Sequence, residues 1–289
     1  MTKFHAQHTN ELLGYPADAR LLIVNADDFG MCHAINQGIY KSLQEGVVSS
    51  TSLMVPCPWA SHAIYLLKEN PSIQFAIHLT VLCDTVLYPW GSLSPKEKVP
   101  TLLDKSGFFY TNDRMAEFLT QAALREVEME FREQIETALR SGLKPTHLDW
   151  HCLHNGGRPD ILDMTFNLAR EYGLALRISD PEWIVKLQDR GLPTDEYELL
   201  DSFSLNTVNK SAQYIRLLRE LPAGLSEWAI HPALDDAEMH TIEPDEPVRQ
   251  TDYAFVTSEE AESTIRQEGI IVLNYKPLQA AWQAISPAL

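Results

Sequence analysis

The stretch from Leu21 to Gly30, LLIVNADDFG, constrains the fold of this chain more than any other. An uninterrupted run of Leu, Ile and Val is typical of a parallel strand buried on both faces. The run stops at Asp27 and Asp28, although an ionised carboxylate at the edge of a core is costly without a compensating partner. Two solvated loop aspartates are the alternative. We expect a strand with an acidic tip, where α/β folds place their ligands, and a turn that Gly30 permits.

Apolar, β-rich runs recur along the chain and alternate with stretches of helical periodicity. We expect strands at 21–27, 47–55, 75–81, 145–150, 174–179, 227–232 and 270–275. We expect helices at 33–46, 59–69, 115–140, 160–172, 212–221 and 258–267. Such alternation implies parallel pairing and right-handed crossovers, in either a barrel or an open doubly wound sheet. Polar residues at four strand ends favour the barrel, so the expected fold is α/β: a single (β/α) barrel-like domain over 1–289, with about seven parallel strands in a distorted TIM-type barrel.

Composition excludes several classes of partner. The 289 residues carry a formal net charge of -17, which disfavours nucleic acid and anionic membranes because both attract clustered Lys and Arg. The start of the chain has no apolar signal region, and no later stretch is apolar enough to span a membrane. Four cysteines without CxxC spacing are most simply reduced thiols. We therefore expect a cytoplasmic protein. The oligomeric state stays open, with a homodimer as the alternative to a monomer.

Two further strands carry imidazoles near their ends. His78 interrupts the apolar run FAIHLTV, and alone it would be read as a satisfied core residue. In PTHLDWHCLH, however, His147, Asp149 and His151 share one face by the two-residue period of a strand. Burying these groups without partners would cost several kcal/mol, so a bound ion or a hydrogen-bonded network is expected.

The remaining polar residues in apolar strands are His231 and Arg177. His231 precedes Pro232, which keeps it extended. Arg177 lies in LALRIS, where a buried guanidinium needs a carboxylate, and Asp27 is a candidate partner. One carboxylate with two imidazoles and a position open to water is the composition of a catalytic divalent-metal site, such as zinc.

The order and spacing of these motifs resemble the YdjC/ChbG-like carbohydrate deacetylases, which are related in mechanism to the polysaccharide deacetylases. The resemblance covers almost the whole chain and rests on NADDFG at 25–30, GVVSSTSLMV at 46–55, IHL at 77–79, PTHLDWH at 145–151, LRIS at 176–179 and HP at 231–232. A weaker match is TSEE at 257–260. The resemblance implies a barrel-like fold and a metal-dependent hydrolase that removes an acetyl group from an N-acetylated sugar and releases acetate.

The same resemblance implies roles for individual residues. Asp28, His78 and His151 look like the ligands of one divalent cation, Zn²⁺ or Mg²⁺, and Asp27 looks like the base that activates water on it. His231 is similar to the histidine that acts as general acid or oxyanion partner, and His147 and Arg177 look like supporting residues. The chain departs from the family pattern HLDSHHH after His151, where it has Cys152 and Leu153. That departure concerns the part of the site that contacts the sugar.

Two other functions are compatible with the same residues. Paired aspartates and histidines also build metal-dependent phosphoesterases, but few further carboxylates lie at strand ends to hold a second metal. Basic residues to bind a phosphate are also few, apart from Arg177 and Arg249. The alternative from another class is a catalytically inert sugar-binding homologue.

The long irregular segments 84–111, 180–210 and 234–256 are expected to shape the substrate site. The first is rich in aromatic residues, and Trp90, between Pro89 and Gly91, has little reason to lie in the core. We expect Trp90 or Tyr88 to stack on a ring of an N-acetylhexosamine or a short oligosaccharide, a small-molecule partner whose acetamide points to the metal. The alternative is that these rings pack the loop onto the barrel.

Overall fold

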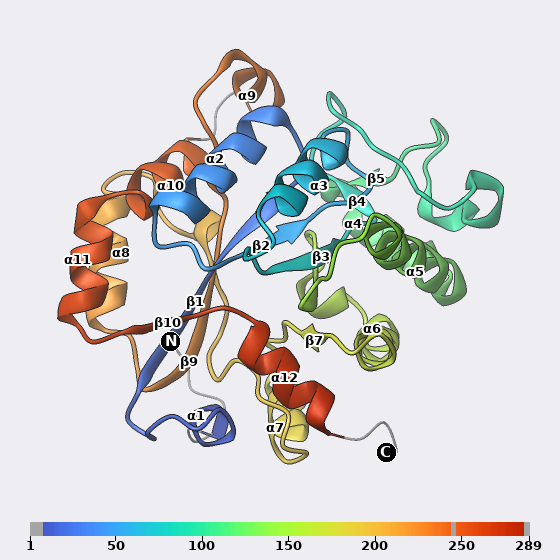
Figure 1. Ribbon diagram of the computed structural model, residues 1–289. Coiled ribbons are helices and arrows are strands. Elements are labelled where there is room, and N and C mark those ends of the chain that lie inside the picture. Colours follow the sequence, from blue (N-terminus) through green and yellow to red (C-terminus); the bar gives the residue numbers. More distant parts are fainter. Residues whose placement is uncertain (1–7, 244–246, 286–289) are drawn as a thin grey trace.

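The computed structural model describes residues 8–243 and 247–285, built around a curled, parallel, eight-stranded sheet with helices on its outside (Figure 1). The strand order is β7-β6-β3-β2-β1-β9-β8, with β10 paired to β1. The strands of this sheet are β1 (Arg20–Phe29), β2 (Ser50–Leu53), β3 (Phe75–Leu79), β6 (His147–Trp150), β7 (Ala175–Leu176), β8 (Leu200–Asp201), β9 (Gly224–Ile230) and β10 (Ile271–Leu273). The path ends at β7 and β8, so the barrel is open between these two strands.

Helices follow most of the strands and return the chain to the opposite end of the sheet (Figure 1). They are α1 (His8–Leu12), α2 (His33–Glu45), α3 (Ala60–Glu69), α4 (Met115–Gln121), α5 (Leu124–Arg140), α6 (Pro159–Tyr172), α7 (Pro181–Gln188), α8 (Lys210–Arg219), α9 (Ala237–Ile242), α10 (Val248–Val256), α11 (Glu259–Gln267) and α12 (Lys276–Ala284). Short 3-10 helices lie at Lys96–Lys98, Pro100–Leu102, Asn112–Arg114, His154–Gly156 and Ser202–Ser204.

The central strand β1 has neighbours along both edges. Every residue of β1 after Arg20 is buried, as expected for a strand covered on both faces. β9 runs along one edge from Arg20 to Ala26. The other edge is shared, because β10 pairs with residues 21–23 and β2 pairs from Asn25 onward. The acidic end of β1 is therefore held in the middle of the sheet.

The expected α/β fold, a distorted barrel of parallel strands, is confirmed. The seven expected strands correspond to β1, β2, β3, β6, β7, β9 and β10. β8 is an additional edge strand of two residues within the segment 180–210, too short to show a period in the sequence. That residues 1–289 form a single domain stays a prediction.

The expected helix at 115–140 is two helices, α4 and α5, with Ala122 and Ala123 in extended conformation between them. The sequence QAALRE contains no helix breaker. The break depends on contacts distant in the chain: Thr101 Oγ1 accepts from the Ala123 N–H at 3.0 Å, and Arg158 donates to the Ala122 carbonyl at 3.0 Å.

The three long segments contain more regular structure than their sequences indicate. The first is bounded by β4 (Leu82–Cys83) and β5 (Tyr110–Thr111), which pair in a separate parallel sheet. The second contains α7 and β8, and the third contains α9 and α10. The four cysteines are free, as expected. Within the described residues, no helix combines the length and apolarity needed to cross a membrane.

Candidate active site

The carboxyl end of β1 turns two adjacent aspartates toward one cavity. Strand alternation would send the side chains of Asp27 and Asp28 to opposite faces. Asp28, however, has a φ of 76°, and the register of β1 on β2 shifts between Ala26 and Phe29. The chain is thus already turning at Asp28, and both carboxylates line the same cavity. A non-glycine residue in the left-handed region is costly, and such residues cluster at functional sites.

Gly30 completes this turn and leaves no room for a side chain. Its φ is 110°, and a Cβ atom there would lie 3.0 Å from the Met54 carbonyl oxygen and 3.3 Å from the Ala60 Cα. The Gly30 N–H donates to Asn36 Oδ1 at 2.6 Å, which ties the turn to the first turn of α2. The expected strand, acidic tip and helix are confirmed in that order.

Asp27 is held by a buried guanidinium. Arg177 donates from Nη1 to Asp27 Oδ2 at 2.9 Å and from Nη2 to Oδ1 at 3.0 Å, so the expected pairing is confirmed. Asn25 Nδ2 also donates to Asp27 Oδ1, at 2.6 Å. Burial alone would raise the pKa of Asp27, but Arg177 and His78 outweigh burial and hold that pKa below its usual value. Asp27 is therefore ionised and fixed in orientation.

His78 and His151 each have one ring nitrogen in contact with a carboxylate that does not belong to the proposed ligand set. His78 Nδ1 is 2.8 Å from Asp149 Oδ1, and His151 Nε2 is 2.8 Å from Asp84 Oδ1. The opposite nitrogens face Asp28 Oδ1: His78 Nε2 at 3.5 Å and His151 Nδ1 at 3.2 Å. A carboxylate on the outer nitrogen fixes the tautomer and orientation of a metal-binding histidine. This arrangement leaves Nε2 of His78 and Nδ1 of His151 for an ion.

Asp28 divides its two oxygens between different partners. Oδ1 faces both imidazoles, whereas Oδ2 accepts from Arg249 Nη1 at 2.8 Å. Burial would raise the pKa of Asp28, but Arg249 and the two histidines hold it well below its usual value. Arg249 is itself buried and also donates from Nε to Glu243 Oε1 at 2.9 Å.

The donor set fits one divalent cation. Asp28, His78 and His151 each offer a ligand atom, and these atoms lie within 4.8 Å of one another. Burial disfavours protonated imidazole, yet Asp149 and Asp27 raise the pKa of His78 to about 9, and Cys152 and Asp84 raise that of His151 well above its usual value. The buried site therefore stabilises positive charge, which a divalent cation would supply.

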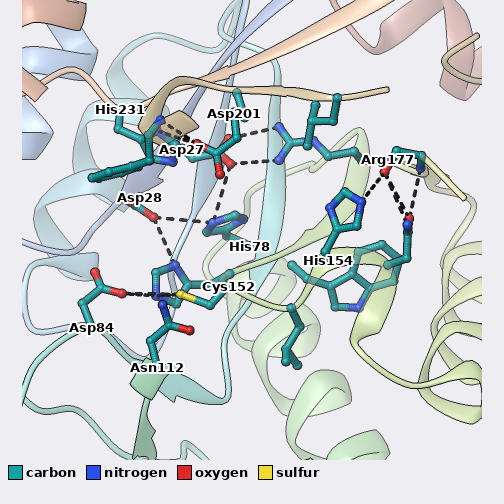
Figure 2. A pocket seen from close by; sticks show the side chains of 18 of the residues that line it. Asp27, Asp28, His78, Asp84, Asn112, Cys152, His154, Arg177, Asp201 and His231 are labelled. Atoms are coloured by element: carbon teal, nitrogen blue, oxygen red, sulfur yellow. Dashed lines mark hydrogen bonds and ion pairs between the residues drawn. The ribbon is translucent and has the colours of Figure 1, made fainter. Parts of the chain in front are cut away.

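His231 follows the last residue of β9. In Figure 2 it lies near Asp27 and Asp201, at the end of the site opposite Asp84 and Cys152. Its Nδ1 is 2.8 Å from the Ser202 hydroxyl, and its backbone N–H donates to Asp252 Oδ2 at 2.9 Å. Asp252 is buried and pairs with Lys210 Nζ at 2.5 Å. The position of His231 is therefore fixed from α10 and α8, and its Nε2 remains free of protein partners in the described contacts.

These side chains surround a cavity of about 500 Å³, within the range of small-ligand sites. In Figure 2, Asp27, Asp28 and His78 lie between Asp84 and Cys152 on one side and His231 and Asp201 on the other. The cavity is lined by Asp27, Asp28, His78, Asp84, Asn112, Trp150, His151, Cys152, Leu153, His154, Asn155, Arg177, Ser179, Leu199, Asp201, Phe203, Ala229, His231, Glu243 and Arg249.

Comparison with known families identifies the chain. A model of the YdjC-like protein family matches residues 21–267, which is most of the sequence. The chain belongs to the YdjC-like family. A protein of Thermoanaerobacter pseudethanolicus named carbohydrate deacetylase is 31% identical over 262 residues, 90% of this chain and 100% of that protein. A carbohydrate deacetylase of Brevibacillus brevis is 31% identical over 89% of this chain and 99% of its own length.

The fold is shared with a solved structure. A protein of Enterococcus faecalis, described as a cellobiose-phosphate cleavage protein, superimposes with a TM-score of 0.79 at 28% sequence identity. The match covers 90% of this chain and 99% of that protein. The YdjC-like fold accordingly extends over almost the whole length of both proteins.

His147 is buried in the core and does not line the cavity. It is fully buried, its ring stacks on Tyr275 with centroids 3.4 Å apart, and its Nδ1 is 2.9 Å from Thr146 Oγ1. Tyr275 in turn donates to Glu227, which accepts from Arg177 Nε at 2.7 Å. Tyr275 and Glu227 therefore connect the His147 ring to Arg177.

The expectation for Trp90 in this YdjC-like protein needs correction. Trp90 is 3% exposed and does not line the cavity. Its indole N–H donates to the Leu82 carbonyl at 2.9 Å, and its ring contacts His151 edge-on with centroids 5.9 Å apart. An indole in that position offers no free face to a sugar. Trp90 packs the loop against His151, which is the alternative use considered for these rings.

The site also contains residues whose contacts the sequence did not predict. Asp84 contacts His151 and Arg249 contacts Asp28, but Asp84 lies in the loop after β4 and Arg249 in α10, a helix that the sequence did not indicate. Asp149 was placed on the correct strand face, but nothing in its spacing indicated His78 as its partner. Cys152, where the chain departs from the family pattern, has a φ of 60° and lies 3.3 Å from His151 Nε2. The departure thus lies directly beside a proposed ligand.

Proposed function

We propose that this chain is a metal-dependent carbohydrate deacetylase, which hydrolyses the acetamide of an N-acetylated sugar to acetate and a free amine. The observation that carries this proposal is the meeting of Asp28, His78 and His151 beside an ionised Asp27 in one cavity. The names of the curated relatives support an acetylated carbohydrate as the substrate.

We assign one divalent cation to Asp28, Nε2 of His78 and Nδ1 of His151. Two imidazoles favour zinc, whereas magnesium prefers oxygen ligands, so Zn²⁺ is the better fit of the two. When bound, such an ion polarises an acyl oxygen and lowers the pKa of water, which is the chemistry it would supply here.

Asp27 is proposed to accept the proton of the attacking water. Both of its oxygens are held by Arg177 at 2.9 and 3.0 Å, so the carboxylate cannot rotate away from the cavity. Arg177 also lies 3.1 Å from Asp149 Oδ2, which connects the base to the carboxylate that orients His78. A positioned base of this kind typically contributes about 10² to 10⁴ in rate.

His231 is proposed to act from the opposite side as general acid or oxyanion donor. The Ser202 hydroxyl occupies its Nδ1, so Nε2 is the nitrogen available to the cavity. Donation to the oxygen that becomes negative in the tetrahedral state is typically worth about 3 to 4 kcal/mol. Asp27 and His231 thus divide the two proton movements that amide hydrolysis requires.

The sugar ring is proposed to lie against Phe203 rather than Trp90. Phe203 lines the cavity, is 42% exposed and contacts the His231 ring with centroids 4.6 Å apart. An exposed aromatic face beside the reacting groups suits the apolar face of an N-acetylhexosamine or a short oligosaccharide. The segment 180–210, which carries Phe203, is therefore the proposed determinant of sugar binding.

Release of acetate from a panel of N-acetylated mono- and oligosaccharides tests this function. We expect acetate and free amine in equal amounts, full activity only with an added divalent cation, and no release by an Asp28→Ala variant of normal thermal stability. Equal release by wild-type and Asp28→Ala protein would refute the metal-dependent mechanism. Release of phosphate from phosphorylated sugars without acetate would favour a phosphoesterase instead.

A further inference from the structure

A second cavity lies at the opposite end of the sheet from the active site. It has a volume of about 690 Å³, within the range of small-ligand sites. Phe75, the first residue of β3, lines it, as do Pro145 and Thr146, which directly precede β6. His78 and His151 lie near the carboxyl ends of the same two strands. Among the described residues, none lines both cavities, so a ligand here would be remote from the proposed catalytic groups.

The charge on the wall of this second cavity is opposite to that of the whole chain. The sequence has 40 acidic residues against 23 basic ones. Lys68, Lys144 and Lys276 nevertheless line the cavity, and none of its described lining residues is Asp or Glu. The three lysines come from the last turn of α3, the segment before β6 and the first residue of α12. The cavity is thus a basic site in an acidic protein.

The three ammonium groups are available to a ligand. All three lysines are exposed, and within the described part of the chain no carboxylate forms an ion pair with them. Lys210, by contrast, is buried and lies 2.5 Å from a carboxylate oxygen of Asp252. Unpaired cations that converge on a concave surface attract anions, because their fields add there.

Apolar side chains form much of the remaining wall. Phe75, Leu143 and Leu174 line the cavity and are only 4%, 7% and 4% exposed, so they belong to the core of the fold. The carbonyl oxygens of Pro145 and Gly173, which would repel an anion, already accept from Gln279 Nε2 at 3.3 and 3.0 Å. The cavity therefore combines an apolar surface with cationic groups.

We propose that this cavity binds a small organic phosphate, in which a phosphate monoester is joined to a ring or another apolar portion. Lysine is a common partner of phosphate, and the apolar wall would bind the rest of the molecule. A phosphate monoester carries a negative charge of about 1.5 to 2 at pH 7, which three lysines can neutralise. This site goes beyond the proposed deacetylase reaction and does not depend on it.

Isothermal titration calorimetry of the full-length, metal-loaded protein tests the proposal with phenyl phosphate as the probe. Benzyl alcohol keeps a ring without the charge, and inorganic phosphate keeps the charge without a ring. We expect phenyl phosphate to bind at least about tenfold more tightly than either, and more weakly as salt is raised. Equal binding of inorganic phosphate would indicate an adventitious ion only and would overturn the proposal, as would a failure of phenyl phosphate to bind.

Lysine variants locate the bound probe. Lys144→Gln and Lys276→Gln each remove one charge from an exposed side chain, so the fold should be unaffected. Each should weaken the binding of phenyl phosphate about 3- to 5-fold, and the double variant about tenfold or more. Lys105→Gln is the matched control, because Lys105 is exposed and does not line the cavity. An equal weakening in Lys105→Gln would attribute the effect to net charge and overturn the site.

Asp28→Ala separates the two cavities. A catalytic ion could also bind a phosphate, but only in the cavity that Asp28 lines. We expect Asp28→Ala to bind phenyl phosphate as wild type does and to lose acetate release. Loss of binding in Asp28→Ala, with unchanged binding in the lysine variants, would place the probe in the active site and overturn the proposal. Binding of phenyl phosphate by a wild-type protein that releases no acetate would support the second site and refute the proposed function.

Discussion

Asp27 and Asp28 are neighbours in the chain and both lie near His78 Nε2, but Asp27 is paired with Arg177 and Asp28 with His151 and Arg249, so their variants should fail differently. Asp28→Asn should lose metal affinity, because Oδ1 of Asp28 faces both imidazoles. Asp27→Asn should keep the metal and lower kcat by about 10² to 10⁴, the usual contribution of a positioned base. Metal content by elemental analysis and steady-state kinetics separate the two effects. Loss of metal in both variants alike would contradict this division of roles.

The outer carboxylate on His151 offers a second test at the same scale. Asp84→Asn keeps an acceptor for His151 Nε2 but removes the charge, and loss of such a partner typically costs about 10- to 100-fold in metal affinity. Asp113→Asn, an exposed residue outside the cavity wall, is the matched control. Competition with a chromophoric chelator measures both affinities. Unchanged affinity in Asp84→Asn would remove Asp84 from the support of the site.

Sequence reasoning identified polar residues in or directly after apolar runs and missed those far from such runs. His78, His151 and Arg177 interrupt apolar runs, so each is visible as a polar residue with a cost to compensate. Asp84 lies in a loop and Arg249 in α10, and in neither segment does the sequence show a period that distinguishes a buried charge from a solvated one. Their role depends on how segments far apart in the chain fold over β1, and a single sequence does not contain that geometry.

Strand β6 begins at His147, whose burial should make the stability of the fold sensitive to acid. Burial lowers the pKa of His147 to about 3, below the usual 6.5. Between pH 6.5 and 3 the unfolded chain therefore binds one more proton at His147 than the folded chain does. The free energy of unfolding that depends on neutral His147 is complete above pH 6.5 and decreases as the pH falls toward 3. The loss amounts to about 1.4 kcal/mol per pH unit.

His147→Phe keeps the stack on Tyr275 without a titrating group. Between pH 7 and pH 5.5, denaturant unfolding should show a smaller loss of stability in this variant than in wild type. The slope of the free energy of unfolding against pH should differ by the contribution of about one proton. His240→Phe, at a site where 64% of the side chain is exposed, should keep the wild-type slope. Identical slopes for wild type and His147→Phe would show that the pKa of His147 does not differ between the folded and unfolded states.

The elements themselves were predictable wherever a period was long enough. β1 and α2 match their expected ranges within a few residues, because each has a continuous pattern. The helix over 115–140 was expected as one element since the stretch contains neither Gly nor Pro, and its break at Ala122 and Ala123 depends on Thr101 and Arg158. β8 escaped detection because two residues cannot show alternation.

For the molecule as a whole, the proposed ion should act as a stabilising ligand. Three ligand residues from β1, β3 and the end of β6 meet only in the folded state, so binding adds about 2.7 kcal/mol at a free metal concentration 100 times Kd. Thermal unfolding in excess Zn²⁺ and after chelation should differ by roughly 5 to 10 °C for a chain of this size. Asp28→Ala should show little difference, and an equal shift in that variant would place the stabilising ion elsewhere.

The shared edge of β1 sets the order in which a newly made chain can acquire its catalytic groups. A ribosome releases β1 first, yet the neighbours of β1 come from residues 50–53, 224–230 and, last, 271–273. Until β9 emerges, Asp27 and Asp28 have β2 on one side and an open backbone edge on the other. Such distant pairings slow folding, and unpaired edges invite association with other chains. The strand that carries the reacting carboxylates is thus the first to be synthesised and among the last to be protected.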